Sequence, residues 1–190
     1  DASSRINKAI DELERLRKYV ELEHHFLDLL VSDIVKTFKD GGKLIFFGNG
    51  GSAAEAQHMA GEYVNRFRFD RTPLPAISLV ADAAVMTSIS NDYDFTEVFV
   101  RQIYAVGKRG DIAIGYSTSG TSKNILRALE VCEEMGIASW LMTGDNATTP
   151  QAPTSSRLIR CPSGDTPRIQ EMHTLIGHVV AEIVEERIFG

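Results

Sequence analysis

Short apolar runs that alternate with helical stretches are the feature that most restricts the fold of this 190-residue chain. We expect strands at residues 43–47, 76–80, 111–116, 139–143 and 157–161. The first, third and last of these runs are each directly followed by a turn or loop and a predicted helix, at about residues 52–67, 122–135 and 167–188. Short buried strands that alternate with helices are typical of a parallel sheet covered on both faces. The sequence therefore predicts an α/β fold.

The pattern of apolar residues in the segment 4–40 predicts one long helix before the first strand. Apolar side chains recur at near-helical spacing along it, beginning with Ile6, Ile10 and Leu13, and Gly41 and Gly42 end it in the usual way. Such a stripe is long for one small domain and needs a partner surface, for which another subunit is suited. We therefore expect a helical segment at residues 1–40 that takes part in oligomerisation, followed by an α/β core at residues 41–190.

The composition indicates one ordinary soluble domain spanning residues 1–190. Hydrophobic residues make up 43% and charged residues 24%, and the net charge of −6 argues against non-specific nucleic-acid binding. Neither a membrane span nor a signal peptide is expected, so a cytoplasmic location is predicted. Cys132 and Cys161 fit no metal motif and are expected to be reduced thiols. The stretch Pro150-Gln151-Ala152-Pro153 is interpreted as a loop, not a domain boundary.

A loop rich in hydroxyl groups follows the third predicted strand. It reads Ser117-Thr118-Ser119-Gly120-Thr121-Ser122 and directly precedes a helix. Hydroxyls, free backbone N–H groups and a helix N-terminus together can hold a phosphate. The alternative is a simple helix cap by Ser122 or Thr121, which accounts for one or two of the five hydroxyls. A P-loop is disfavoured because no lysine stands in the Walker position.

A glycine loop, Gly48-Asn49-Gly50-Gly51-Ser52-Ala53, follows the first predicted strand. It matches the dinucleotide pattern G-x-G-x-x-A, but that pattern expects an acidic residue about 20 residues onward. The first acid after the second strand is Asp82, which is too far along the chain. Ser52 and Glu55 also match a capping box, a structural role that accounts for both residues.

Two helices carry side chains suited to proton transfer or metal binding. His58 and Glu62 are four residues apart, on one face of the helix after the glycine loop. The last helix carries Gln170, His173 and His178. From spacing alone, a surface pair or a hydrogen-bonded, partly buried histidine is the better explanation of these residues.

Taken together, four motifs resemble the SIS (sugar isomerase) domain family, and within it the sedoheptulose 7-phosphate isomerases. They are the run Gly48-Asn49-Gly50-Gly51-Ser52-Ala53-Ala54-Glu55-Ala56-Gln57-His58, then Asn91-Asp92, then Ser117-Thr118-Ser119-Gly120, then Arg168-Ile169-Gln170-Glu171-Met172-His173. The resemblance covers essentially the whole chain in the same order. It implies a three-layer, flavodoxin-like sandwich with a five-stranded parallel sheet, and a homotetramer with active sites at subunit interfaces.

The same resemblance implies an aldose–ketose isomerase that converts D-sedoheptulose 7-phosphate to D-glycero-D-manno-heptose 7-phosphate, the first step of bacterial heptose biosynthesis towards lipopolysaccharide. Glu62 and His178 would be the acid–base pair. One zinc ion per subunit is expected on His58, Glu62, Gln170 and His178. The implied substrate contacts are Asn49, Gly50, Gly51, Ser52, Asn91, Asp92, Ser117, Thr118, Ser119, Ser122 and Gln170. Gln170 and His178 are separated by roughly 12 Å of helix rise, so one metal reaches both only through converging side chains, a distorted helix or two subunits.

Two non-catalytic alternatives share this resemblance. One is an SIS tetramer that binds the replication initiator protein, in which the positions matching Glu62 and His178 are not Glu and His. The other is a sugar-phosphate sensor, which usually carries a DNA-binding domain for which no residues remain in this chain. Because both Glu62 and His178 are present, the sequence favours the isomerase.

Overall fold

The computed structural model of the chain, which describes residues 1–145 and 152–190, contains a five-stranded sheet. All neighbouring strands pair in parallel. In sheet order the strands are β2 (Ala76–Ser78), β1 (Leu44–Gly48), β3 (Ile112–Ser117), β4 (Ala138–Thr143) and β5 (Arg157–Arg160). Each predicted strand is present with boundaries within two residues of the prediction.

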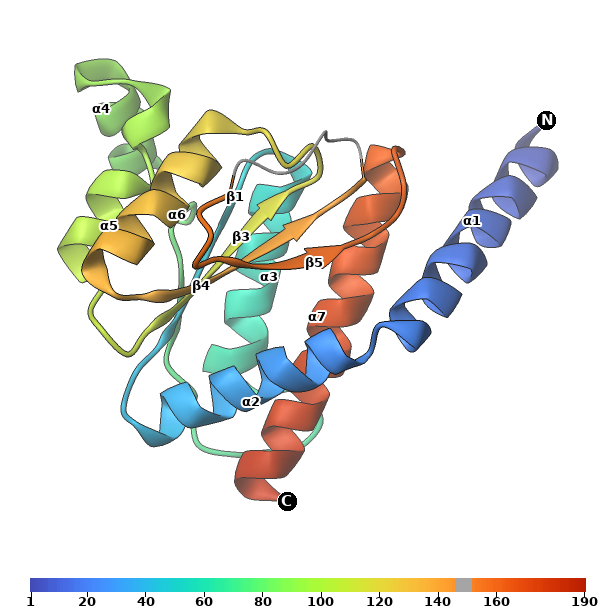
Figure 1. The fold of residues 1–190 in the computed structure, drawn as a ribbon, viewed down its shortest axis with the longest axis horizontal. Coiled ribbons are helices and arrows are strands. Elements are labelled where there is room, and N and C mark those ends of the chain that lie inside the picture. Colours follow the sequence, from blue (N-terminus) through green and yellow to red (C-terminus); the bar gives the residue numbers. More distant parts are fainter. Residues whose placement is uncertain (146–151) are drawn as a thin grey trace.

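Helices cover both faces of this sheet (Figure 1). The helices α2 (His25–Lys39), α3 (Gly51–Val64) and α7 (Thr166–Phe189) share one core with Leu44 and Phe46 of β1. The helices α5 (Val100–Val106) and α6 (Lys123–Met135) share the other core with Ile45 and Phe47. Alternate residues of a strand point to opposite faces, so β1 supplies both cores. The predicted three-layer α/β fold is confirmed.

The prediction of one helix over residues 4–40 is wrong, because the structure has two helices there. The first, α1 (Ala2–Leu22), ends at Glu23, and α2 starts at His25. A continuous helix would bring residues 23 and 24 to the apolar face between Val20 and Leu27, and both are polar. The chain therefore bends at this point, and the two helices run in different directions (Figure 1).

The two helices differ in what they bury. Val31 and Ile34 of α2 are fully buried in the core. By contrast, α1 buries Leu16 and leaves Ile6 and Ile10 more than half exposed, at 58% and 56%. The N-terminal part of α1 projects from the body (Figure 1). The predicted need for a partner surface therefore falls mainly on α1.

The segment between β2 and β3 holds three short helices that the periodicity of the sequence does not predict. They are α4 (Ala83–Asp92), the 3₁₀ helix η1 (Phe95–Glu97) and α5. The Asp82 carboxylate caps α4 by accepting hydrogen bonds from the N–H groups of Ala84 and Val85. An N-cap Asp is a recognisable start signal, but the helices that follow are too short to establish an apolar repeat.

Both cysteines lie in the interior of the protein. Cys132 and Cys161 are free and buried, and burial raises the pKa of each thiol to about 12. None of the helices described here has an apolar stretch long enough for a membrane span. Of the predicted loop at residues 150–153, Ala152 and Pro153 lie outside helices and strands, whereas Pro150 and Gln151 lie outside the described residues.

His173 of α7 makes the stability of the protein sensitive to acid. Burial lowers the pKa of this ring from its usual 6.5 to about 4, against a weak contact with the Thr143 carbonyl. Between these two pKa values the His173 ring is protonated in the unfolded chain and neutral in the folded protein. The resulting stabilisation is complete above pH 6.5 and is lost as the pH falls towards 4, by about 3 kcal/mol in total. Urea unfolding at pH 7 and pH 4.5 is expected to show this loss in the parent protein and a smaller one in His173→Gln.

Candidate active site

The two unusual loops meet at the carboxyl edge of the sheet. The glycine loop follows β1, the hydroxyl-rich loop follows β3, and these strands are neighbours. The side chains of Asn49 and Asn124 join the loops through two reciprocal amide hydrogen bonds of 2.9 and 2.8 Å. The amide of Asn49 is therefore occupied by α6. Ligands in open α/β sheets bind at this edge.

Hydroxyl groups converge in the loop after β3. The Ser117 hydroxyl lies 3.0 Å from that of Ser122 and 3.5 Å from that of Ser119. Ser119 also accepts hydrogen bonds from the hydroxyl and the N–H group of Thr121. Ser122 is the N-cap residue of α6, yet within the described residues its side chain makes no capping hydrogen bond. The alternative of a simple cap is thus wrong for Ser122, and the hydroxyls gather on one another instead.

The glycine loop brings backbone close to α7. Gly50 is the N-cap of α3 with a φ of 57°, a conformation that favours glycine. A Cβ atom on Gly51 would lie 2.6 Å from the amide nitrogen of Gln170, so a side chain at this position would displace the Gln170 amide. The capping-box interpretation of Ser52 and Glu55 is wrong, because Gly50 occupies the cap and the Glu55 carboxylate turns to α7.

The helices α3 and α7 pack against each other along a line of facing residues that we call the α3–α7 seam. From the sheet edge downwards, its pairs are Gly51 with Gln170, Glu55 with Thr174, and His58 and Glu62 with His178. Successive members on each helix are three or four residues apart, which keeps them on one face. The seam therefore carries side chains from the glycine loop down to the predicted acid–base pair.

His58, Glu62 and His178 form a tight cluster on the seam. The Nε2 atoms of the two histidines are 2.7 Å apart. Oε1 of Glu62 lies 3.3 Å from Nε2 of His58 and 3.8 Å from Nε2 of His178. All three side chains keep contact with solvent, at 46%, 21% and 36% exposure in the order named. The structure thus brings together residues that are up to 120 positions apart in the sequence.

The donor atoms of this cluster fit a zinc ion. Two imidazole nitrogens and a carboxylate oxygen are typical of zinc sites that keep a position open for water or substrate. With bond lengths near 2.1 Å, the ligands of tetrahedral zinc stand roughly 3.4 Å apart, and the three separations here lie on both sides of that value. Each of the three residues offers one ligand atom, and these atoms all lie within 4.8 Å of one another.

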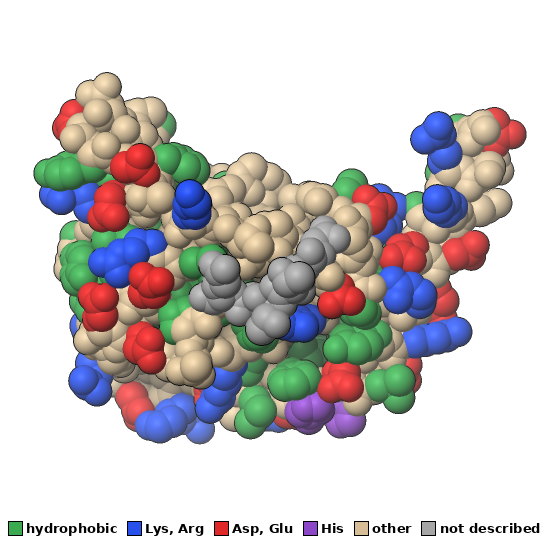
Figure 2. Space-filling view, turned by 45° about the horizontal axis from the view of Figure 1, so that its top comes forward, with side chains coloured by type: hydrophobic (Ala, Val, Ile, Leu, Met, Phe, Trp, Pro, Cys, Tyr) green, Lys and Arg blue, Asp and Glu red, His purple; other side chains and the backbone are tan. Residues whose placement is uncertain are grey.

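Gln170, the fourth predicted zinc ligand, lies elsewhere on the seam. Its amide packs against Gly51, eight residues before His178 on the same helix. Asn91 and Asp92, two predicted substrate contacts, lie exposed on the last turn of α4 and hydrogen-bond to each other. Figure 2 shows α4 and the N-terminal part of α1 projecting on either side of a face that is mostly backbone and uncharged polar side chains.

Glu55 is a candidate functional residue that sequence reasoning assigned to a structural role. The residue is 8% exposed, and one carboxylate oxygen accepts a 2.6 Å hydrogen bond from Thr174. The other oxygen finds no hydrogen-bond partner among the described residues. Burial raises the pKa of this carboxyl, although the Thr174 bond, His58 and His178 oppose the shift. The sequence signal was its place one turn before His58 on the same face.

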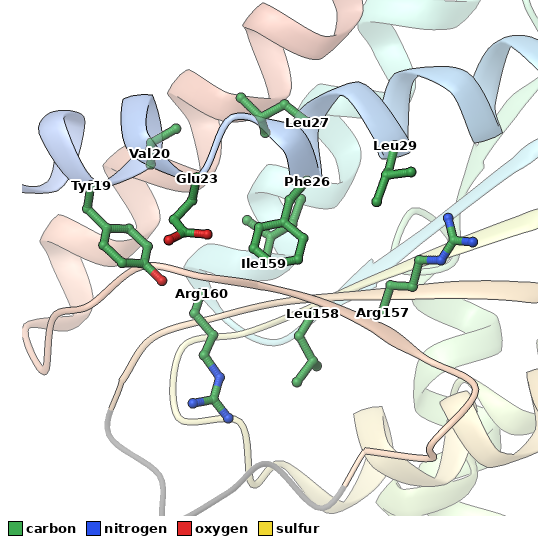
Figure 3. A pocket seen from close by; sticks show the side chains of 10 residues that line it. All are labelled: Tyr19, Val20, Glu23, Phe26, Leu27, Leu29, Arg157, Leu158, Ile159 and Arg160. Atoms are coloured by element: carbon green, nitrogen blue, oxygen red, sulfur yellow. The ribbon is translucent and has the colours of Figure 1, made fainter.

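A partly open cavity lies away from these residues. A cavity of about 530 Å³ lies between the α1–α2 junction and the edge strand β5 (Figure 3). Phe26, Leu27 and Ile159 line it, with Arg157 and Arg160 also among its side chains. None of the predicted site residues, all of which the structure describes, lines this cavity.

Comparison with known proteins gives consistent matches. A family model described as SIS domain matches residues 9–144. A phosphoheptose isomerase of Thermodesulfovibrio yellowstonii is 43% identical over 190 residues, covering 100% of this chain and 94% of that protein. Phosphoheptose isomerase 2 of Campylobacter jejuni is 48% identical over 158 residues, covering 83% and 78%. A solved phosphoheptose isomerase from Francisella tularensis superposes with a TM-score of 0.91 at 30% identity, covering 98% and 99%.

Proposed function

Because the chain belongs to the SIS domain family and matches phosphoheptose isomerases along its whole length, we propose that it interconverts D-sedoheptulose 7-phosphate and D-glycero-D-manno-heptose 7-phosphate. The observation that carries this proposal is the cluster of His58, Glu62 and His178 on the α3–α7 seam. Such a reaction is an aldose–ketose isomerisation, and it would begin bacterial heptose biosynthesis. An initiator-binding relative has no need of a convergent acid–base pair.

The chemistry requires a proton to move between adjacent carbons through an enediol. A base must remove it, and an acid must protonate or hydrogen-bond the carbonyl oxygen as charge develops there. We assign the base to Glu62 and the acid to His178, whose Nε2 lies 3.8 Å from the carboxylate. Glu62 is partly buried and reaches both histidines, so it can pass its proton along the cluster.

The two loops at the sheet edge would bind the phosphate end of the substrate and the sugar next to it. The converging hydroxyls of Ser117, Ser119 and Ser122, at the N-terminus of α6, would hold the phosphate. The backbone of Gly50 and Gly51, with Gln170 beside it, would approach the sugar. Holding the substrate at both ends converts binding energy into positioning of the reacting carbons.

Zinc, assembly and location complete the proposal. His58, Glu62 and His178 would hold one zinc ion per subunit, and bound zinc would supply Lewis-acid stabilisation of the developing oxyanion. Glu62 would then have two roles, as a ligand of the zinc ion and as the base. The exposed apolar side chains of α1 support association of subunits. We propose that the assembly is a homotetramer with active sites at subunit interfaces, and that the protein is cytoplasmic.

The proposed reaction can be tested directly. Purified protein should convert sedoheptulose 7-phosphate to the aldoheptose 7-phosphate, followed by NMR of the sugar carbons. The assay is run on protein stripped with a chelator, on stripped protein with zinc restored, and on untreated protein. We expect turnover to fall on stripping and to return with zinc. If all three samples leave the substrate unchanged, the isomerase assignment is wrong.

The phosphate assignment gives a separate prediction. Ser119→Ala removes one hydroxyl from the cradle, and a hydrogen bond to a charged group contributes about 1.5–3 kcal/mol. We expect KM to rise roughly 10- to 100-fold while kcat changes little, because the reacting carbons are distant from this loop. Ser32→Ala on α2 serves as the control, since its hydroxyl bonds the Asp28 carbonyl away from the site. An unchanged KM in Ser119→Ala would place the phosphate elsewhere.

A further inference from the structure

A buried ion pair closes the lower end of the α3–α7 seam. Nε of Arg71 lies 2.7 Å from Oε1 of Glu185, and the two side chains are 2% and 1% exposed. Arg71 lies in the loop after α3, and Glu185 lies on α7 two turns beyond His178. The pair therefore joins the loop that ends one seam helix to the other seam helix.

The guanidinium of Arg71 caps the end of α3. It donates to the carbonyl of Glu62 at 2.9 Å and to that of Tyr63 at 2.8 Å. The last carbonyls of a helix have no partner within the helix, so an outside donor fixes that turn. Arg71 thus holds the backbone of Glu62 itself, while its own position is set by Glu185.

Glu185 holds the chain that packs on His178. Its two carboxylate oxygens accept hydrogen bonds from the N–H groups of Phe67 at 3.0 Å and Arg68 at 2.7 Å. The ring of Phe67 lies against that of His178, with centroids 5.5 Å apart. Burial alone would raise the pKa of Glu185, but the two amides and Arg71 together lower it, so this carboxyl stays ionised at neutral pH.

Stability alone is a weak reason for such a pair. Two buried charges lose their hydration, and well-packed apolar residues at the same place are often as stable or more so. The ion pair instead fixes the orientation of its neighbours, because each carboxylate oxygen and each guanidinium nitrogen is hydrogen-bonded to a defined partner. Those partners are the backbone of Glu62 and the segment that places Phe67 on His178.

We propose that Arg71 and Glu185 are positioning residues that set the spacing of His58, Glu62 and His178. The pair acts through Glu62 and Phe67 and touches no reacting atom. Its effect on the reaction rests on the function proposed above, whereas its effect on the geometry of the cluster does not. Zinc affinity therefore provides a readout that is independent of turnover.

Glu185→Gln tests the proposal, because it keeps the side-chain shape and removes the charge. Zinc affinity is measured on the stripped protein by competition with a chromophoric chelator, and kcat and KM are measured beside it. Partners that orient metal ligands typically account for 10- to 100-fold in metal affinity or activity. We expect zinc affinity and kcat each to fall by about that factor, with KM within about twofold of the parent value.

The matched control is Glu182→Gln, three residues earlier on α7. Glu182 pairs with Arg68 of the same loop, but the two side chains are 37% and 62% exposed. Exposed pairs contribute little, so this variant should behave as the parent in both measurements. Parental zinc affinity and kcat in folded Glu185→Gln would overturn the proposal, as would an equal loss in Glu182→Gln.

A second variant decides the matter if Glu185→Gln does not fold. Phe67→Leu leaves the ion pair intact and removes the ring beside His178; a zinc affinity unchanged from the parent would overturn the proposal, and a several-fold loss would support it. A parent protein that binds zinc but turns over no sugar would instead contradict the proposed function. The zinc measurements would still decide the positioning role in that case.

Discussion

Glu62→Gln should reduce kcat by roughly 10²- to 10⁴-fold, the usual contribution of a general acid or base. The amide keeps the size of the side chain and cannot take a proton from the sugar. KM is expected to change less, because the two loops at the sheet edge would still hold the substrate. Steady-state kinetics by NMR or a coupled assay measure both parameters.

His178→Ala is expected to show a loss of similar size, since it removes the proposed acid and a member of the same cluster. The double variant should lose little more than either single variant, because residues that act as a unit are not additive. Glu171→Gln, exposed on the first turns of α7, provides the control. Near-parental kcat in both single variants would return the interpretation to a non-catalytic SIS protein.

Replacing Ile6 and Ile10 of α1 by Asp should break the assembly. Both side chains are more than half exposed, so their replacement leaves the core intact. Burying a full apolar side chain at an interface contributes about 1.5–3 kcal/mol, and a buried unpaired carboxylate adds a desolvation cost. We expect the mass measured by light scattering to fall from a tetramer to smaller species, with unchanged circular dichroism.

Activity should fall together with the mass if active sites lie at subunit interfaces. Arg17→Ala on the same helix is the control, because this side chain pairs with Glu14 and Glu21 of its own helix. A double variant that keeps the parental mass would show that α1 does not hold the subunits together. Deleting residues 4–40 is a poorer test, because α2 buries Val31 and Ile34 in the core.

The sequence predicted the sheet well because the central strands β1, β3 and β4 are short runs that are almost entirely buried. On β1, for example, every residue from Leu44 to Gly48 is buried, and such runs have little alternative in a parallel sheet. The break between α1 and α2 was missed because Glu23 and His24 are ordinary helix residues. Their polarity ends the helix only because α2 packs on the core, and that packing depends on residues far away in the sequence.

Local sequence shows part of the candidate site. The hydroxyl loop is visible in the sequence itself, and spacing places His58 and Glu62 on one helix face, but their predicted role came from the resemblance to the SIS family. The role of Glu55 was misassigned because a capping box and a buried carboxylate facing Thr174 have the same local sequence. Arg71 could not be found, since its partners are backbone carbonyls and a carboxylate 114 residues away.

The α3–α7 seam makes this site intolerant of changes in helix length. Both helices run in the same direction, and their facing pairs follow one another by a single turn. One residue inserted into α7 between Thr174 and His178 would rotate everything after it by about 100°. Gln170 and Thr174 would stay in place, while His178 would turn away from α3 and Glu185 from the loop that follows α3. Substitutions can change this site one residue at a time, whereas a single insertion would separate the sugar-holding end from the proton-moving end.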